Sequence, residues 1–193
     1  MDQRLSQGSS SAANRTAILA AARRQFGDAG YFGATLRSVA KMAGVDPRLI
    51  RHYFHSKAEL FRTAVDMESD IESIRARILA GDRDDVGKRL AREFFLLWTA
   101  SPESVRALVA GAMSYPGAAE VLRAHLVGDL LAPLIAELDV DQSDLRAALV
   151  GSHLLGVALL YHLVPVAVLH RTEVNHLADA IGPELQRLLT GEL

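Results

Sequence analysis

The sequence contains no cysteine, so the chain can form neither disulfide bonds nor cysteine-ligated metal sites. A chain of this kind suits a reducing compartment, and we expect it in the cytoplasm. Aromatic residues are also scarce, at 6% of 193 residues, although hydrophobic residues make up 50%. That hydrophobic fraction is enough for one or two globular domains with a buried core.

Long hydrophobic runs are missing too. The most apolar run, 154–169, contains Tyr161, His162 and Pro165 and is shorter than the roughly 20 residues that a membrane crossing needs. We therefore expect a buried helix there and no membrane partner. Residues 1–13 are polar and serine-rich, without the apolar core of a signal peptide, and we expect them to form a flexible tail.

Enzyme and metal motifs are absent as well. Segment 81–88 resembles a phosphate-binding loop, but its spacing is one residue too long and three aspartates would repel phosphate. Glycines do not flank Ser114 as they do in a nucleophile elbow. Of the seven histidines, only His52 and His55 are close in sequence, and they lack the carboxylate of a zinc-binding helix. We predict that the protein is not an enzyme and has no metal and no cofactor.

The periodicity of the apolar residues predicts an all-α fold. No segment alternates apolar and polar residues over strand length, and no hairpin dipeptide such as Asn-Gly occurs. Four helices are predicted in the N-terminal part: one ending at Gly30, one from Thr35 to Gly44, one starting at Asp46-Pro47, and one over 57–79 opened by a Ser56–Glu59 capping box. Three more follow over 84–98, from Ser101-Pro102 (a short helix) and over 116–138, the last of them kinked at Pro133. The final two are predicted over 142–169 and from Thr172, the latter kinked or broken at Gly182-Pro183.

The net charge of −2 conceals an uneven distribution along the chain. Residues 1–66 hold ten basic and five acidic residues, whereas residues 67–193 hold eleven basic and eighteen acidic residues. A basic N-terminal part on an acidic body suggests a polyanion that meets only one end of the molecule. Charge alone leaves open the alternative of a solvated helical surface.

The short helix after Asp46 has two distinct faces. Ile50 and Phe54 lie four residues apart, with Tyr53 beside them, and this face is expected to pack inward. Arg48, Arg51 and His52 fall on the opposite side. Together with the preceding short helix and its glycine turn, this pattern predicts a helix-turn-helix. A basic outer face can enter a major groove, where arginine pairs with guanine O6 and N7.

Residues 15–65 resemble the DNA-binding domain of TetR-family (tetracycline-repressor-like) transcriptional regulators. The resemblance is carried by the segments RTAILAAARRQFGDAGYFGATLRSVAKMAGV and HYFHSKAELF. The remaining chain matches the family only in length and helical organisation. The resemblance implies a helix-turn-helix DNA-binding domain over 14–60 and a larger helical domain for effector binding and dimerisation over 61–193.

We predict the following interface with double-stranded DNA, in which Tyr53 and Lys57 match positions where the resemblance implies backbone contacts. Arg48 and Arg51 are predicted to read bases, and Thr35, Arg37, Tyr53 and Lys57 to contact phosphates, with Val45, Asp46, Pro47 and His52 completing the surface. Many family members have an aromatic residue where this chain has Arg51 and a small residue where it has Arg48, so base preference does not transfer. For each side chain taken singly, the alternative is a solvated surface residue.

The resemblance also implies an effector cavity and a homodimer. The predicted ligand pocket comprises Phe94, Leu97, Trp98, Met113, Tyr115, His125, Leu126, His153, Tyr161 and His162, for each of which ordinary core packing is an alternative. The predicted dimer interface comprises Ala147, Gly151, Leu155 and Ala158 on one helix and Leu177, Ile181, Leu185 and Leu188 on the next, with a purely intramolecular core as the alternative.

The sequence therefore predicts a dimeric, ligand-responsive transcriptional regulator. We expect a repressor that a small apolar or amphipathic ligand releases from a palindromic operator, with recognition helices about 34–36 Å apart. The predicted helix over 57–79 would link the two domains. The alternative is a ligand-binding or interaction protein that keeps a helix-turn-helix without operator function.

Overall fold

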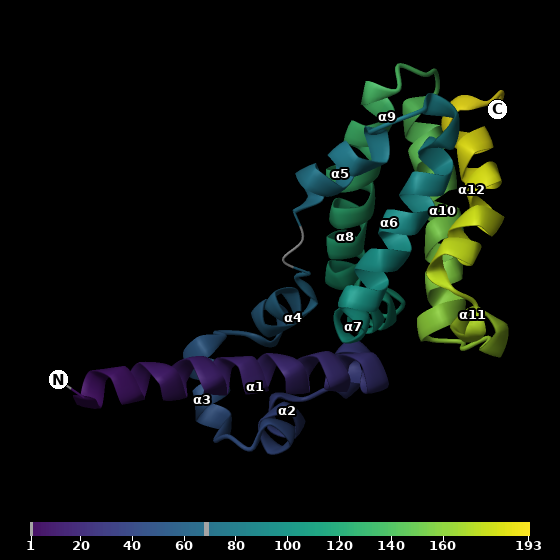
Figure 1. Ribbon diagram of the computed structural model, residues 1–193. Helices are drawn as coiled ribbons and strands as arrows, with labels where there is room; N and C mark the ends of the chain where they lie inside the picture. Colours follow the sequence, from purple (N-terminus) through teal and green to yellow (C-terminus); the bar gives the residue numbers. More distant parts are fainter. Residues whose placement is uncertain (1, 68–69) are drawn as a thin grey trace. The chain divides into compact units, whose positions relative to one another are not determined.

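The computed structural model describes residues 2–67 and 70–193, with side chains from residue 11 onward (Figure 1). All regular elements in this part of the chain are helical, which confirms the all-α prediction. In chain order they are α1 (Asp2–Gly33), α2 (Leu36–Ala43), α3 (Pro47–Tyr53), α4 (Lys57–Val65), α5 (Ile71–Leu79), the 3₁₀ helix η1 (Arg83–Asp85), α6 (Val86–Ala100), α7 (Pro102–Ala112), α8 (Pro116–Arg123), the π-helix η2 (Ala124–Leu131), α9 (Ala132–Glu137), α10 (Ser143–His162), α11 (Ala167–Arg171) and α12 (Val174–Thr190).

The helices form two compact units. The first unit comprises Met1–Met67 and Glu103–Val121, and the second unit comprises Glu68–Pro102 and Leu122–Leu193. This division by packing differs from the predicted domain boundary after residue 60. The whole of α4 and most of α7 and α8 pack in the first unit, although α7 and α8 follow α5 and α6 in sequence.

The core of the first unit forms around α1. Ile18, Ala22 and Phe26 are almost completely buried, as their spacing predicts, and the ring of Phe26 meets that of Phe61 edge-on at 5.0 Å. At Gly30 the backbone takes φ 66° and ψ 178°, so the regular helix is interrupted where the sequence predicted its end. The predicted flexible tail over 1–13 is wrong for residues 2–13, which continue α1 as helix; no proline interrupts this stretch.

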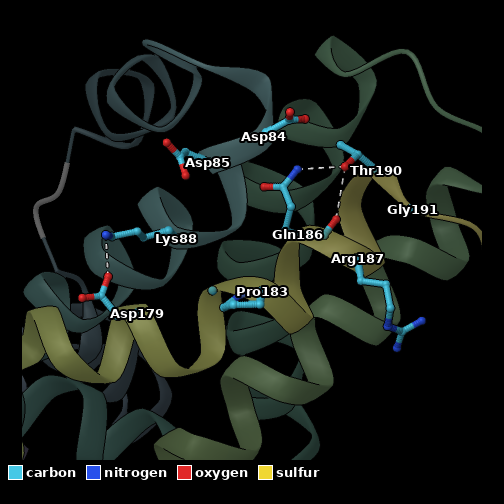
Figure 2. A pocket seen from close by; sticks show the side chains of 10 residues that line it. Asp84, Asp85, Lys88, Asp179, Pro183, Gln186, Arg187, Thr190 and Gly191 are labelled. Carbon is cyan, nitrogen blue, oxygen red and sulfur yellow. Dashed lines mark hydrogen bonds and ion pairs between the residues drawn. The ribbon is translucent and has the colours of Figure 1, made fainter.

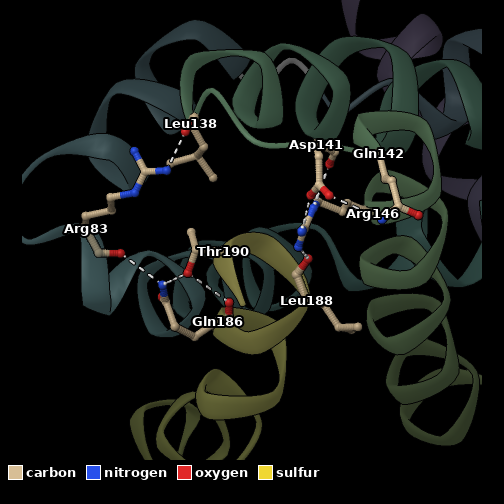
Figure 3. Close-up of polar contacts among 8 residues, drawn as sticks. All are labelled: Arg83, Leu138, Asp141, Gln142, Arg146, Gln186, Leu188 and Thr190. Carbon is tan, nitrogen blue, oxygen red and sulfur yellow. Dashed lines mark hydrogen bonds and ion pairs between the residues drawn. The ribbon is translucent and has the colours of Figure 1, made fainter. Parts of the chain in front are cut away.

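In the second unit, α6 and α12 approach each other at two glycines. A Cβ atom on Gly87 would lie 2.4 Å from the backbone nitrogen of Gln186, and one on Gly182 would lie 2.9 Å from the Cα atom of Lys88. The side chain of Gln186 on α12 joins both α6 and η1, because its Oε1 accepts from the Gly87 N–H at 2.7 Å and its Nε2 donates to the Arg83 carbonyl at 3.0 Å. Figure 3 shows the second of these bonds.

A buried arginine connects the start of α10 to the end of α12 (Figure 3). Arg146 is only 3% exposed. Its Nη1 donates to the Leu188 carbonyl and its Nε to the Asp141 carbonyl, both at 2.8 Å, and it forms an ion pair with the Asp141 carboxylate. Burial of a guanidinium is tolerated because these acceptors replace its water. Hydrogen bonds from Arg146 and then Gln142 lower the pKa of Asp141.

The predicted helix over 57–79 is wrong, because two helices occupy this range. α4 ends at Val65, and Asp66 has the extended angles φ −64° and ψ 119°. α5 begins after Asp70, whose carboxylate accepts from the Ser73 N–H at 3.0 Å and so provides a new N-cap. A continuous linking helix is therefore not present.

Three further helix predictions need correction. The segment 116–138 contains the π-helix η2 before Pro133, so its irregularity begins ahead of the proline. The predicted helix over 142–169 ends at His162, because Pro165 lacks the N–H that a continuing helix requires and a turn precedes α11. The last helix, α12, begins at Val174 rather than Thr172 and runs through Pro183 without a break.

Candidate nucleic-acid interface

Local hydrogen bonds set the ends of the helix-turn-helix. Thr35 caps α2, and its Oγ1 accepts from the Ser38 N–H at 3.0 Å while its own N–H donates to Ser38 Oγ at 3.1 Å. Gly44 ends α2 in the left-handed conformation, with φ 69° and ψ 30°. Asp46 then caps α3, accepting from the Arg48 N–H at 2.7 Å, and Pro47 occupies the first helical position. The predicted helix-turn-helix is confirmed.

The two faces of α3 divide as the sequence predicts. Ile50 and Phe54 are buried in the first unit, whereas Arg48, Arg51 and His52 are exposed. Among the ion pairs of the described residues, none includes Arg48 or Arg51. Their guanidinium groups are thus free to meet an external polyanion.

Two residues predicted at the DNA surface act as caps instead. The hydroxyl and N–H of Thr35 are both bonded to Ser38, and the carboxylate of Asp46 holds the first turn of α3. Of the groups at the start of α2, the N–H groups of Leu36 and Arg37 are the donors best placed for a phosphate. Arg37 is itself exposed, which suits the predicted phosphate contact.

The two remaining predicted phosphate contacts are half-buried and have local partners. The hydroxyl of Tyr53 lies 2.9 Å from Ser11 Oγ and donates to the Ser11 carbonyl at 3.2 Å. The Nζ of Lys57 lies 4.7 Å from the centroid of the Tyr31 ring and 3.5 Å from the Phe32 carbonyl oxygen. Partial burial lowers the pKa of Lys57.

The predicted capping box at the start of α4 is only half formed. Ser56 Oγ accepts from the Glu59 N–H at 3.0 Å, as expected. The Glu59 carboxylate, however, accepts from the His55 N–H at 3.1 Å and lies 3.2 Å from His55 Nδ1. The reciprocal bond is therefore displaced by one residue from the N-cap.

Sequence reasoning missed the contribution of α1 to this surface. The guanidinium of exposed Arg15 lies 5.6 Å from the centroid of the Phe54 ring, and Ser11 bonds to Tyr53. Both residues thereby lie next to the C-terminal end of α3. The sequence offered one indication of this contribution: Arg15 lies three positions before the buried Ile18, where the polar N-terminal sequence becomes apolar.

The structure brings four of the predicted pocket residues together in the second unit. The rings of Phe94 and Trp98 lie 4.4 Å apart, and Trp98 lies 5.3 Å from His162 and 6.1 Å from Tyr161. Leu97, on the same helix as Trp98, is half-buried. We call Phe94, Trp98, Tyr161 and His162 the aromatic cluster.

Two other predicted pocket residues lie in the first unit and do not join the aromatic cluster. Tyr115 stacks on Tyr31, with a centroid distance of 3.7 Å and an interplanar angle of 7°. Met113 is 69% exposed in the turn before it. Tyr115 is half-buried, and its ring contacts lie in the first unit.

The last three predicted pocket residues lie in the second unit without a shared contact. His125 Nδ1 lies 3.3 Å from the Asp129 carboxylate within η2, and Leu126 is half-buried beside it. His153 is exposed on α10, where its Nδ1 lies 3.0 Å from the Leu149 carbonyl oxygen. These positions give no independent support to a pocket assignment.

A hollow of about 570 Å³ lies between η1, α6 and α12 (Figure 2). Its lining is largely charged or polar and includes an ion pair between Lys88 and Asp179. The hydrogen bond to Asp179 raises the pKa of Lys88. None of the predicted pocket residues lines this hollow.

The predicted dimer interface is wrong for six of its eight residues, which are buried in the core of their own chain. These are Ala147, Gly151 and Ala158 on α10 and Leu177, Leu185 and Leu188 on α12. Leu155 and Ile181 are half-buried. The packing of α10 on α9, η2 and α12, together with that of α12 on α6, accounts for the burial of these six residues.

The opposite face of α10 is the exposed one. It presents Leu145 and Leu160, at 48% and 41% exposure, with the small residues Ala148, Ser152 and Gly156 between them. By length and composition alone α10 is apolar enough to cross a membrane, with a mean hydropathy of 1.3, and only 33% of its apolar window is buried. The expectation of a buried helix over 154–169 is therefore wrong in both extent and burial.

Comparison with known proteins connects both parts of the chain to one family. Residues 18–64 match the family model for bacterial regulatory proteins of the tetR family, and residues 84–189 match that for the tetracyclin repressor-like C-terminal domain. A stretch of 46 residues is 46% identical to the HTH-type transcriptional regulator BetI of Rhizobium meliloti (strain 1021). That match spans 24% of this chain and 23% of the relative, less than a quarter of its length.

Two solved structures extend the comparison to the whole fold. A TetR-family regulator from Streptomyces coelicolor A3 is 27% identical, with a TM-score of 0.62 over 93% of this chain and 96% of that one. The transcriptional regulator FadR from Bacillus subtilis, solved in complex with stearoyl-CoA, is 17% identical, with a TM-score of 0.64 over 92% of this chain and 99% of that one. TetR-family regulators bind DNA and small-molecule effectors and are dimeric. Since the C-terminal model alone matches more than half of the sequence, this chain belongs to the TetR family and is a DNA-binding transcriptional regulator.

Proposed function

We propose that this protein is a cytoplasmic repressor that binds a palindromic operator as a homodimer and leaves it when a small apolar or amphipathic ligand binds. The observation that carries the proposal is the outer face of α3. Arg48, Arg51 and His52 are exposed there, while Ile50 and Phe54 fix the helix to the core. Regulation by binding alone involves no catalysis by this chain.

Sequence reading is assigned to Arg48 and Arg51. Both follow the N-cap Asp46 within two turns, so they project from the end of α3 that enters a major groove in helix-turn-helix proteins. An arginine that pairs with guanine O6 and N7 discriminates by about 1–3 kcal/mol against another base. Arg37, the start of α2 and Lys57 would position the unit on phosphates.

The exposed face of α10 is assigned to the dimer interface. Leu145 and Leu160 would be buried by the same face of a second subunit, and Ala148, Ser152 and Gly156 would let two helices approach closely. A helix as apolar as α10 needs more burial than the 33% that its own chain provides. This assignment replaces the predicted face that includes Ala147.

The aromatic cluster is assigned to effector binding. Large apolar rings with a few polar groups, here the Tyr161 hydroxyl and the His162 ring, are typical of small-molecule sites. A protein of the same fold, FadR from Bacillus subtilis, holds stearoyl-CoA, which is amphipathic. The ligand acts only through a difference in affinity between the DNA-binding and released conformations.

Transmission to the DNA is assigned to α7, in place of the predicted continuous helix over 57–79. Two ion pairs join α7 to α1 in the first unit: Arg24 with Glu103 at 2.9 Å and Asp28 with Arg106 at 2.8 Å. α7 also follows α6, which carries Phe94 and Trp98, after a single residue. Displacement of α6 by a ligand would therefore pull on α1 through α7.

Selection of bound duplexes from a random DNA pool at physiological salt tests the proposal. Recovery of one near-palindromic motif is expected, and Arg48→Ala and Arg51→Ala should each relax the preference at one position of the half-site. Retention that depends on salt but not on sequence would overturn operator recognition. It would favour the alternative of a ligand-binding protein that keeps the helix-turn-helix.

A further inference from the structure

Three side chains from distant parts of the sequence form a stack in the first unit. The Lys57 ammonium lies 4.7 Å from the centroid of the Tyr31 ring, and the Tyr31 ring lies 3.7 Å from that of Tyr115 at an interplanar angle of 7°. Tyr31 follows the break in α1, Lys57 opens α4, and Tyr115 lies between α7 and α8. We call these residues the Lys57 stack.

The backbone around Tyr115 holds its ring in this position. The Tyr115 N–H donates to the Gly111 carbonyl at 2.8 Å, which fixes the turn after α7. A Cβ atom on Gly117 would lie 2.5 Å from the Tyr115 ring, so this glycine is needed for the ring to lie where it does. Phe61 meets Tyr31 edge-on at 5.5 Å and bounds the stack from within the core.

The electrostatics of the stack favour a cation on its outer side. The face of an aromatic ring is negative and attracts an ammonium, so Tyr31 restrains Lys57 without neutralising it. Burial, followed by a hydrogen bond with Tyr115, raises the pKa of Tyr31. A carboxylate partner would instead compete with phosphate for the same ammonium.

We propose that Tyr115 is a positioning residue for DNA binding, which holds the Tyr31 ring so that this ring presents the Lys57 ammonium to a DNA phosphate at the start of α4. Tyr115 thereby makes the turn between α7 and α8 a determinant of DNA affinity, although that turn contains no proposed DNA contact. The inference rests on the proposed role of Lys57 as a phosphate contact. It reassigns Tyr115 from the predicted ligand pocket.

The test uses the full-length protein and a duplex of mixed sequence, because a phosphate contact is independent of base sequence. Affinity is measured over a range of salt concentrations for wild type, Lys57→Ala, Tyr115→Leu and the double variant. Lys57→Ala should bind about tenfold more weakly, with a salt slope lower by about one per subunit. Tyr115→Leu should lose about fivefold with a lower slope, and the double variant should match Lys57→Ala within about twofold.

Two matched controls separate positioning from folding. Tyr115→Phe keeps the ring and should bind within about twofold of wild type. Met113→Ala alters an exposed side chain in the same turn and should have no effect on DNA affinity. Equal affinity of Tyr115→Leu and wild type, with a weakened Lys57→Ala, would overturn the stack while leaving the phosphate contact intact. An unaffected Lys57→Ala would instead overturn the phosphate contact itself.

A measurement on the wild-type protein avoids any variant that fails to fold. The sequence has three lysines, Lys41, Lys57 and Lys88, so their side-chain NMR signals are readily assigned. The ε-protons of Lys57 should be shifted upfield by the Tyr31 ring relative to those of the other two. Addition of the duplex should then shift the Lys57 signals more than those of Lys88. Three coincident lysine signals in the free protein would overturn the stack.

Discussion

The helix-turn-helix and the second unit differ in how far apart in sequence the contacts that shape them lie. In the first unit, the ends of the helix-turn-helix are set by bonds such as that between Thr35 and Ser38, three residues apart. In the second unit, the Gly87 N–H bonds to the side chain of Gln186, 99 residues away. Local capping determines the shape of the DNA-reading surface, whereas long-range packing determines how the helices of the second unit lie against one another.

The largest effect is expected where α6 and α12 approach most closely. Gly87→Ala should lower the free energy of unfolding by about 3 kcal/mol, because the new methyl group would lie 2.4 Å from a backbone nitrogen of α12. Chemical denaturation of purified protein measures this change. Gly128→Ala is the matched control, since a Cβ atom there meets nothing within 4 Å, and it should not destabilise the protein. Wild-type stability of Gly87→Ala would contradict the close approach.

A smaller loss is expected at the buried arginine. Arg146→Met keeps most of the side-chain volume but removes the donor to the Leu188 carbonyl, and it should cost about 2 kcal/mol in urea unfolding. Arg92→Met, on an exposed position of α6, should change stability by less than about 0.5 kcal/mol. If both substitutions changed the free energy of unfolding equally, the long-range bonds of Arg146 would not contribute to the stability of the second unit.

Removal of a helix N-cap should lower the free energy of unfolding less than removal of the buried arginine. Thr35→Ala removes the acceptor of the Ser38 N–H and should destabilise the protein by about 1 kcal/mol, whereas Thr35→Ser keeps the oxygen and should recover most of this. Urea unfolding of both variants and of wild type measures these changes. If Thr35→Ala lowered the free energy of unfolding more than Arg146→Met, the local cap would contribute more than the long-range bond, which would contradict the expected ranking.

The smallest expected effect is a change at acidic pH in the stability that the Asp141–Arg146 interaction contributes. The pKa of Asp141 is lowered in the folded state, chiefly by its hydrogen bond with Arg146. The stabilisation that results is present above the ordinary aspartate pKa of about 3.9 and is lost as pH falls through the lower pKa of the folded state. The stability difference between wild type and Arg146→Met should therefore narrow below about pH 4. A difference that stays constant to pH 2 would contradict the coupling.

The same contrast explains what could be predicted from the sequence. The starts of α2, α3 and α4 and the inward face of α3 depend on residues a few positions apart, so their patterns were readable. The exposed arginines of α3 followed from that register. The partners of Tyr53 and Lys57, which are Ser11 and Tyr31, depend on tertiary packing and left no local pattern.

Errors in the second unit have a common physical origin. Small and apolar residues on α10 suit both a subunit interface and an internal core, and the sequence pattern of Ala147, Gly151 and Ala158 does not distinguish these. Which face turns inward is decided by packing against α9, η2 and α12, and the residues of α10 alone do not record this packing. The break between α4 and α5 was missed for a similar reason, because Asp70 offers a cap within a pattern that remains helical on both sides.

The carbonyl oxygen of Ala64, at the end of α4, accepts both from Arg23 Nε on α1 at 2.8 Å and from Ser104 Oγ on α7 at 3.3 Å. Together with the ion pairs of α7, this makes residues 103–121 part of the folded DNA-binding module. A fragment that ends at residue 67 would therefore lack part of the module. A chimaera that joins this DNA-binding module to the effector domain of another regulator would have to include residues 103–121 as well as the helix-turn-helix.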